Sequence, residues 1–296
     1  MTTILVIGAT GHVGRPVAER LRVDGRRVRL LVRDVNRARR LLGNGFDLVR
    51  GSIDEPGAVS AAMSGIDGVH VSVTGGTVAE MMAAEAIGMK VVAAEAARAG
   101  IGLVSYVSGN LVREEYGPKL PEHRAKIIAE DALMASGVPF VIFRPTYFME
   151  NLTRHIQGGR AITIGHPQPL HMVAAADFGS MVSRAFDTPA AHHQELVVHG
   201  PEPLTIQQAL ACYRDLVRPE LRCTTVPVPV MAAANRLFLR GSLTGPIQLM
   251  RLLERIGERG DPAPCRRLLG TAMTTLRQWC ASVATAERAD VKERAA

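Results

Sequence analysis

The fold is decided by residues 3–14, TILVIGATGHVG, in which a β-branched apolar run leads directly into a glycine-rich turn. Thr3 to Ile7 is typical of a strand, and Val13 to Val23 carries apolar side chains at helical spacing. Such a turn lets backbone N–H groups approach a pyrophosphate, and the helix that follows adds partial positive charge. The stretch predicts a dinucleotide-binding strand–turn–helix unit; the alternative is a purely structural turn. The candidate cofactor-binding residues here are Gly8, Thr10, Gly11, His12, Val13 and Gly14, with Thr74 and Gly75 after a later strand.

The second predicted strand, Arg27 to Val32, bears on the choice of cofactor. NAD-preferring folds usually place an acidic residue about 20 residues beyond the glycines, for the ribose 2′-hydroxyl. Here Arg33 follows the strand, where its guanidinium could pair with a 2′-phosphate, and Arg37 could reach the same group from the next helical turn. This pattern favours NADP(H). Asp34 keeps NAD(H) as the alternative.

Strands and helices alternate through the first 145 residues. After the first two strands, we expect strands at 47–50, 68–73, 103–107 and 140–143, and helices at 35–42, 56–63, 78–99 and 124–135. Such alternation implies right-handed β-α-β crossovers and a parallel sheet covered by helices on both faces. The fold class is therefore α/β, a doubly wound sheet of the Rossmann type.

The pattern changes after Arg144-Pro145, where glycines and prolines indicate a loop-rich stretch. We expect a Rossmann domain at residues 1–150, with a returning strand near 196–199, and a smaller, mainly helical substrate lobe at 151–284 with a strand at 224–227. Residues 285–296 are predicted to be a flexible tail.

Composition excludes several classes of protein. The net charge is +7, but only four of the 35 basic residues are lysine, and the arginines are scattered along the chain. Aromatic residues make up 4%, too few for a base-stacking surface, so no nucleic-acid partner is expected. No apolar run approaches the ~20 residues that cross a bilayer, so no membrane partner is expected.

The cysteine and histidine patterns offer no metal site. The four cysteines include no C-x-x-C pair and are most simply reduced thiols in a cytosol, and the pair His192-His193 lacks further ligands at metal spacing. The N-terminus shows no signal peptide, so a cytoplasmic location is expected.

The residues resemble the atypical short-chain dehydrogenase/reductase superfamily, specifically its NmrA-like NAD(P)-binding branch. The motifs that carry the resemblance, over residues 1 to about 230, are 8–14 (GATGHVG), 31–34 (LVRD), 106–108 (YVS), Lys126 with Glu130, 136–139 (SGVP), 144–151 (RPTYFMEN) and 200–205 (GPEPLT). The resemblance implies a cofactor-binding and catalytic Lys126, which holds the nicotinamide ribose in active members. It also implies a carbonyl-polarising residue at Ser108 or Asn110.

The usual catalytic pair of the superfamily is incomplete in this sequence. Active members place a tyrosine four residues before the lysine, and that position is Glu122 here. Three residues are candidates for the missing acid: His123, three residues before Lys126 and with an ordinary pKa near 6.5; Tyr116; and Tyr147. The fourth alternative is that water or the substrate itself supplies the proton.

The favoured function is an NADPH-dependent reductase, an enzyme acting on a small, largely apolar carbonyl, quinone or enone compound. Two alternatives keep the cofactor: an isomerase, dehydratase or cyclase, and a regulatory protein that senses NAD(P) without catalysis. The expected partner is a small-molecule substrate, and a homodimer stays a hypothesis.

Overall fold

The computed structural model describes residues 2–75, 77–114 and 117–295, which divide into two compact units. Unit 1 comprises residues 1–145, 175–198 and 260–271, and unit 2 comprises residues 146–174, 199–259 and 272–296. Each unit is described by itself.

Within the described residues, unit 1 is built on a seven-stranded parallel sheet in the order β11-β6-β5-β4-β1-β2-β3. The strands are β1 (Thr3–Ile7), β2 (Arg27–Val32), β3 (Asp47–Arg50), β4 (Gly68–Val71), β5 (Leu103–Val107), β6 (Phe140–Pro145) and β11 (Gln194–Val198). The predicted doubly wound sheet is confirmed. Its core strands are almost wholly buried, because helices cover both faces.

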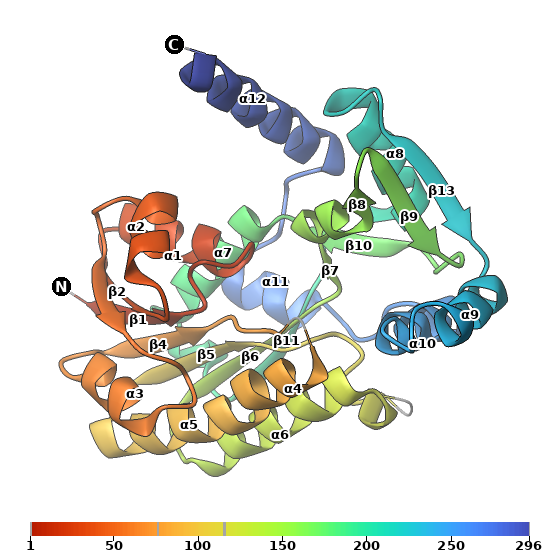
Figure 1. Cartoon of the computed structure of the whole chain (residues 1–296). Helices are drawn as coiled ribbons and strands as arrows, with labels where there is room; N and C mark the ends of the chain where they lie inside the picture. The colour runs from red at the N-terminus through yellow and green to blue at the C-terminus, as the bar shows by residue number, and fades with distance from the viewer. Residues whose placement is uncertain (1, 76, 115–116, 296) are drawn as a thin grey trace. The chain divides into compact units, whose positions relative to one another are not determined.

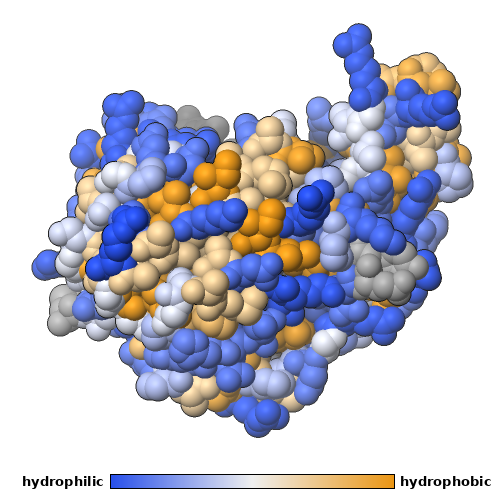
Figure 2. All heavy atoms as spheres, turned by 90° about the horizontal axis from the view of Figure 1, so that it is seen from below, coloured by the Kyte–Doolittle hydropathy of each residue, from blue (hydrophilic) through white to orange (hydrophobic). Residues whose placement is uncertain are grey.

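The helices of unit 1 form two layers (Figure 1). One layer holds α1 (Gly14–Val23), α7 (Ala175–Ala185) and α11 (Ala263–Leu269), with α2 (Val35–Leu42) beside β3. The other holds α3 (Pro56–Met63), α4 (Val78–Met81), α5 (Gly88–Ala99) and α6 (Pro121–Ala135). Seen from below, this second layer presents hydrophilic side chains broken by smaller apolar areas (Figure 2).

The structure corrects several predictions for unit 1, among them the end of β6, which lies at Pro145 rather than at 143. Strand β4 ends at Val71 rather than at 73, and α6 begins at Pro121 rather than at 124, because proline is well suited to a first helical turn. The expected helix 78–99 is interrupted by a π-helical segment, η1 (Met82–Ile87), which separates α4 from α5.

Unit 2 holds two three-stranded sheets, in the orders β12-β10-β7 and β13-β9-β8. Their strands are β7 (Tyr147–Phe148), β8 (Ile156–Gln157), β9 (Arg160–Ile164), β10 (Leu170–Val173), β12 (Pro203–Leu204) and β13 (Arg222–Val226). The stretch after residue 145 that we expected to be mostly loop therefore contains strands β7 to β10. Strands β7 and β8 have only two residues each, too few to show an alternation of polar and apolar residues.

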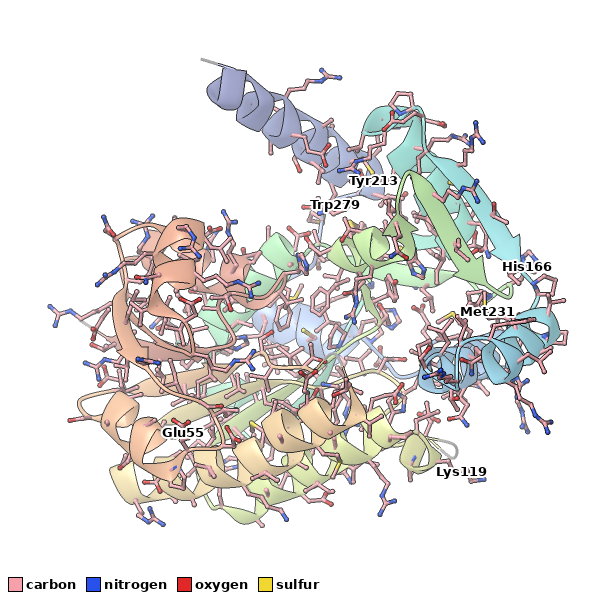
Figure 3. All side chains as sticks on the ribbon, in the orientation of Figure 1. Glu55, Lys119, His166, Tyr213, Met231 and Trp279 are labelled. Atoms are coloured by element: carbon pink, nitrogen blue, oxygen red, sulfur yellow. The ribbon has the colours of Figure 1, made fainter. Side chains whose placement is uncertain are left out.

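The helices of unit 2 are α8 (Ile206–Leu216), α9 (Val228–Leu237), α10 (Thr244–Ile256) and α12 (Leu276–Ala295). Tyr213 of α8 and Trp279 of α12 pack with their ring centroids 6.0 Å apart (Figure 3). Helix α12 continues through the segment expected to be a flexible tail, where Glu287 forms an ion pair with Arg218 at 3.2 Å. No helix in the described part of the chain combines the length and apolarity that a membrane span requires.

Candidate active site

The predicted cofactor residues gather at one edge of the sheet of unit 1. Gly8 follows β1, Arg33 follows β2, and Thr74 follows β4, while Ser108 follows β5. Because the strands are parallel, their carboxyl ends meet at the same edge, and the strand order reverses between β1 and β4. Doubly wound folds bind ligands at this switch point.

Two glycines of the turn are required by the fold itself. Gly8 has a φ of +94°, and a Cβ there would lie 2.0 Å from the carbonyl oxygen of Ser72 on the neighbouring chain segment. A Cβ at Gly14 would lie 2.3 Å from the carbonyl oxygen of Gly8. Both positions exclude a side chain whether or not a ligand is present.

Gly11 is less constrained by packing than Gly8 and Gly14. Gly11 is exposed, and a Cβ there would lie 3.3 Å from the carbonyl oxygen of Gly8. The first turn of α1 has neither a side-chain cap nor an acidic residue, so its N–H groups face no competing anion. The turn therefore fits a pyrophosphate, with Thr10 half-buried, His12 exposed and Val13 half-buried around it.

The residues after β2 bear on whether the site suits the ribose 2′-hydroxyl of NAD(H) or the 2′-phosphate of NADP(H). The Asp34 carboxylate caps α2 by accepting a hydrogen bond from the Arg37 backbone N–H at 2.9 Å, which lowers the pKa of Asp34. Arg33 and Arg37 are exposed. Among the described residues, no hydrogen bond or ion pair engages the Arg33 guanidinium. Asp34 thus has a structural role, while Arg33 is available to a ligand.

Gly75 has a packing role after β4. A Cβ there would lie 2.4 Å from the backbone nitrogen of Met81, so glycine lets α4 approach this loop. Thr74, its neighbour, is exposed.

Lys126 on α6 is held by a buried carboxylate that we did not predict from the sequence. Its Nζ donates to Glu85 Oε2 at 2.7 Å and to the Val107 carbonyl oxygen at 3.4 Å. The Tyr106 hydroxyl donates to the same Glu85 oxygen at 2.8 Å, and Glu85 is 1% exposed. An ammonium carries three N–H donors, so one N–H of Lys126 is left for a ligand.

The π-helical segment η1 explains how Glu85 reaches this position. A single π-helical turn shifts the side chains that follow it relative to a regular α-helix, and such segments are common at functional sites. Here the segment Met82–Ile87 turns Glu85 toward Tyr106 and Lys126. Burial and the adjacent Glu85 charge raise the pKa of Tyr106, which therefore stays protonated as a donor.

Ser108 is committed to a second buried carboxylate. Its hydroxyl donates to Glu130 Oε1 at 2.5 Å, and Arg113 and Arg144 both donate to Glu130 Oε2, at 2.5 and 2.9 Å. Since a serine hydroxyl has one proton, Ser108 cannot also donate to a substrate carbonyl in this arrangement. The backbone N–H of Asn110, the alternative residue, donates to the Pro145 carbonyl oxygen at 3.2 Å.

His123 does not have the pKa that we expected from its residue type. The side chain is buried, and desolvation together with the neighbouring Lys126 charge lowers its pKa to about 4. The imidazole is therefore neutral at pH 7, where an acid with a pKa near 6.5 would be partly charged. A neutral imidazole is a poor proton donor, so the structure weakens the case for His123 as the acid.

Because His123 is buried in its neutral form, the free energy of unfolding should fall in acid. The unfolded chain binds a proton at His123 near pH 6.5, whereas the folded chain binds it only near pH 4, so stability present above pH 6.5 is lost as the pH falls toward 4. Between pH 7.5 and 5, the wild type should lose about 2 kcal/mol more unfolding free energy than His123→Asn. Urea unfolding at the two pH values measures this difference. Equal losses would show that His123 is not buried in its neutral form.

The remaining two candidate acids are placed differently. Tyr147 belongs to unit 2, where its hydroxyl lies 2.9 Å from His155 Nε2 and burial raises its pKa. Tyr116 lies outside the described residues.

The family follows from a match that covers most of the chain. The model of the NmrA-like family matches residues 1–248. The chain belongs to the NmrA-like family. Among curated proteins, this NmrA-like protein is 28% identical over 292 residues to "(4-alkanoyl-5-oxo-2,5-dihydrofuran-3-yl)methyl phosphate reductase" of Streptomyces griseus subsp. griseus, covering 96% of this chain and 98% of the relative.

Solved structures of low sequence identity share the fold. The NADPH-dependent quinone oxidoreductase of Escherichia coli in complex with NADPH matches with a TM-score of 0.74 and 18% identity, over 95% of this chain and 99% of its own. A short-chain dehydrogenase/reductase superfamily protein of Agrobacterium tumefaciens with bound NAD matches with a TM-score of 0.69 and 20% identity, over 99% of this chain and 100% of its own. Proteins of this fold thus bind either dinucleotide, and the fold alone does not select one.

Proposed function

We propose that this NmrA-like protein is an NADPH-dependent reductase of a small, largely apolar quinone or conjugated carbonyl compound. The observation that carries the proposal is the exposed glycine turn at the start of α1, where a Cβ at Gly11 would meet only the Gly8 carbonyl oxygen, at 3.3 Å, and a side chain would fill the space of a pyrophosphate. The neighbouring N-terminus of α1, free of a side-chain cap, supports an anionic ligand at the same place.

The charges of unit 1 support NADPH as the cofactor. Arg33 is exposed at the end of β2, whereas Asp34, the residue that would favour NADH, caps α2. A guanidinium binds phosphate with paired, charge-assisted hydrogen bonds.

Lys126 is the residue that we place at the reacting end of the cofactor. Glu85 and the Val107 carbonyl fix its Nζ, and its remaining N–H would bind the nicotinamide ribose. When bound, the nicotinamide supplies a hydride to the substrate. We propose solvent water as the source of the matching proton, because Ser108 is bonded to Glu130 and His123 is neutral at pH 7. Tyr116, which lies outside the described residues, stays the alternative donor.

The proposed substrate class rests on the names of similar proteins. The Streptomyces relative is named for the methyl phosphate of an alkanoyl 5-oxo-2,5-dihydrofuran, whose ring has a carbon–carbon double bond conjugated to its carbonyl. The Escherichia coli structure is a quinone oxidoreductase. Both compounds contain a carbonyl conjugated to a carbon–carbon double bond, and such a conjugated system accepts a hydride. A compound of this kind is what we propose for this chain.

Incubation of the purified protein with NADPH and a panel of quinones and 5-oxo-2,5-dihydrofurans tests this function. We expect NADPH oxidation that depends on one of these compounds, with the reduced product identified by chromatography, and none with NADPH alone. Tight NADPH binding without oxidation by any member of the panel would favour the sensing or isomerising alternatives instead.

Arg33→Ala tests the cofactor preference separately. Loss of a charge-assisted phosphate contact should weaken NADPH binding by about ten- to a hundredfold and leave NADH binding nearly unchanged. Calorimetric titration measures both affinities, and Arg39→Ala, at an exposed arginine of the following helix α2, is the control. Equal wild-type affinities for NADPH and NADH would contradict the assignment.

A further inference from the structure

Unit 2 brings together three side chains that are far apart in the sequence. His171 lies on β10, His199 directly follows β11, and Glu258 follows α10. One ligand atom from each lies within 4.8 Å of the others, and all three residues are half-buried. We predicted no metal site from the sequence, because these residues have no recognisable spacing along the chain.

The backbone beside Gly200 places the two histidines next to each other. The Gly200 N–H donates to the His171 carbonyl oxygen at 3.0 Å. A Cβ at Gly200 would lie 1.6 Å from the Met172 carbonyl oxygen, so only glycine allows the two segments to approach this closely. As a result, the imidazoles of His171 and His199 stack with centroids 4.9 Å apart and an interplanar angle of 17°.

Glu258 presents its carboxylate to both rings. Its Oε2 accepts a hydrogen bond from the His171 backbone N–H at 2.8 Å, which fixes the orientation of the group. Its Oε1 contacts His171 Nδ1 and lies 3.7 Å from His199 Nδ1. The side chains of His171, His199 and Glu258 are 29, 9 and 15% exposed, so the cluster is shielded but open to solvent on the His171 side.

We propose that His171, His199 and Glu258 form a binding site for a divalent transition-metal ion of the zinc class. Two imidazoles and one carboxylate are a common ligand set for zinc, with water in the fourth position. Tetrahedral ligands at about 2.0 Å from the metal lie about 3.3 Å apart, close to the separation of His199 Nδ1 and Glu258 Oε1. Imidazole donors favour zinc over magnesium or calcium, which prefer oxygen.

Binding requires little rearrangement of the cluster. The ion would take the place of the proton between His171 Nδ1 and Glu258 Oε1, and the neutral imidazole would then carry its proton on Nε2. The second carboxylate oxygen keeps its bond to the His171 backbone, as outer contacts of metal ligands commonly do. The ion would join β10, the segment after β11 and the end of α10, and so stabilise unit 2.

Zn²⁺ titration of chelator-treated, full-length protein tests the proposal. We expect about one Zn²⁺ bound per chain, a melting temperature that rises with Zn²⁺ concentration, and no such rise with Mg²⁺ or Ca²⁺. Glu258→Gln and His199→Gln should each weaken Zn²⁺ binding by at least about tenfold. The glutamine at 258 can still accept the His171 backbone N–H, and circular dichroism checks that both variants fold.

The control must separate this site from other histidines and from the thiols. His166, exposed in unit 2 (Figure 3), supplies the matched variant His166→Gln, which should bind Zn²⁺ like the wild type. Co²⁺ substitution should give a visible spectrum without a thiolate charge-transfer band, because no cysteine is proposed as a ligand. Absence of saturable Zn²⁺ binding, undiminished binding in both cluster variants, or a thiolate band would each overturn the proposal.

Discussion

Replacing Gly11 with valine should lower the affinity for NADPH by at least about a hundredfold without unfolding the chain. The nearest atom to a new Cβ is the Gly8 carbonyl oxygen at 3.3 Å, so we expect a shift of a few tenths of an ångström to accommodate it. The branched side chain would instead fill the exposed space above the N-terminus of α1, where we place the pyrophosphate. Calorimetric titration measures the loss, and circular dichroism checks the fold.

Two further glycine variants make this result specific. Gly57→Val on α3 adds the same side chain at an exposed position with nothing within 4 Å, so it should fold and bind NADPH normally. Gly14→Ala should instead destabilise the protein, because its Cβ would lie 2.3 Å from a backbone oxygen. Normal NADPH affinity in folded Gly11→Val would mean that the glycine turn is only structural.

The second large effect concerns Lys126. Lys126→Met should reduce turnover by at least about a hundredfold, since it removes the N–H that we propose binds the nicotinamide ribose. The same change leaves the Glu85 carboxylate buried without its cation, which should cost about 3 kcal/mol or more of unfolding free energy. Loss of activity in this variant alone would therefore not separate a catalytic role from a structural one.

A double variant separates the two roles. Adding Glu85→Gln to Lys126→Met removes the unpaired charge, and the glutamine still accepts the hydrogen bond of Tyr106. Stability should then recover most of its loss, while turnover stays low. Urea unfolding and steady-state rates measure the two quantities independently. If turnover recovers together with stability, Lys126 acts only through the fold.

Much of unit 1 could be predicted from sequence, because its strands and helices show their periodicity locally. Strands β1, β2, β3 and β5 and helices α2 and α3 have the predicted bounds. The glycine turn and Arg33 lie where predicted, at the carboxyl edge of the sheet, since strand ends in a parallel sheet are set by the strands themselves. Strands β7 and β8, of two residues each, are too short for a pattern, and β9 and β10 lie among glycines and prolines that indicated a loop.

The chemistry around Lys126 could be predicted only in part. The resemblance to a known family picked out Lys126 and Ser108 by position, and the spacing from Lys126 suggested His123. Neither signal indicated the surroundings of these residues. Glu85 bonds Lys126, Glu130 bonds Ser108, and burial lowers the pKa of His123 to about 4. A glutamate in an alanine-rich helix gives no sign that it is buried.

The sequence by itself determined the α/β class, the strand–turn–helix unit at residues 3–23 and the arginine after β2, because each depends on residues close together in the chain. Only the tertiary structure decided which polar groups are paired. Glu85 meets Lys126 across 41 residues, and His171 meets Glu258 across 87. Such contacts depend on a π-helical turn, on Gly200 and on the packing of distant segments, and burial then sets the charge of the groups involved.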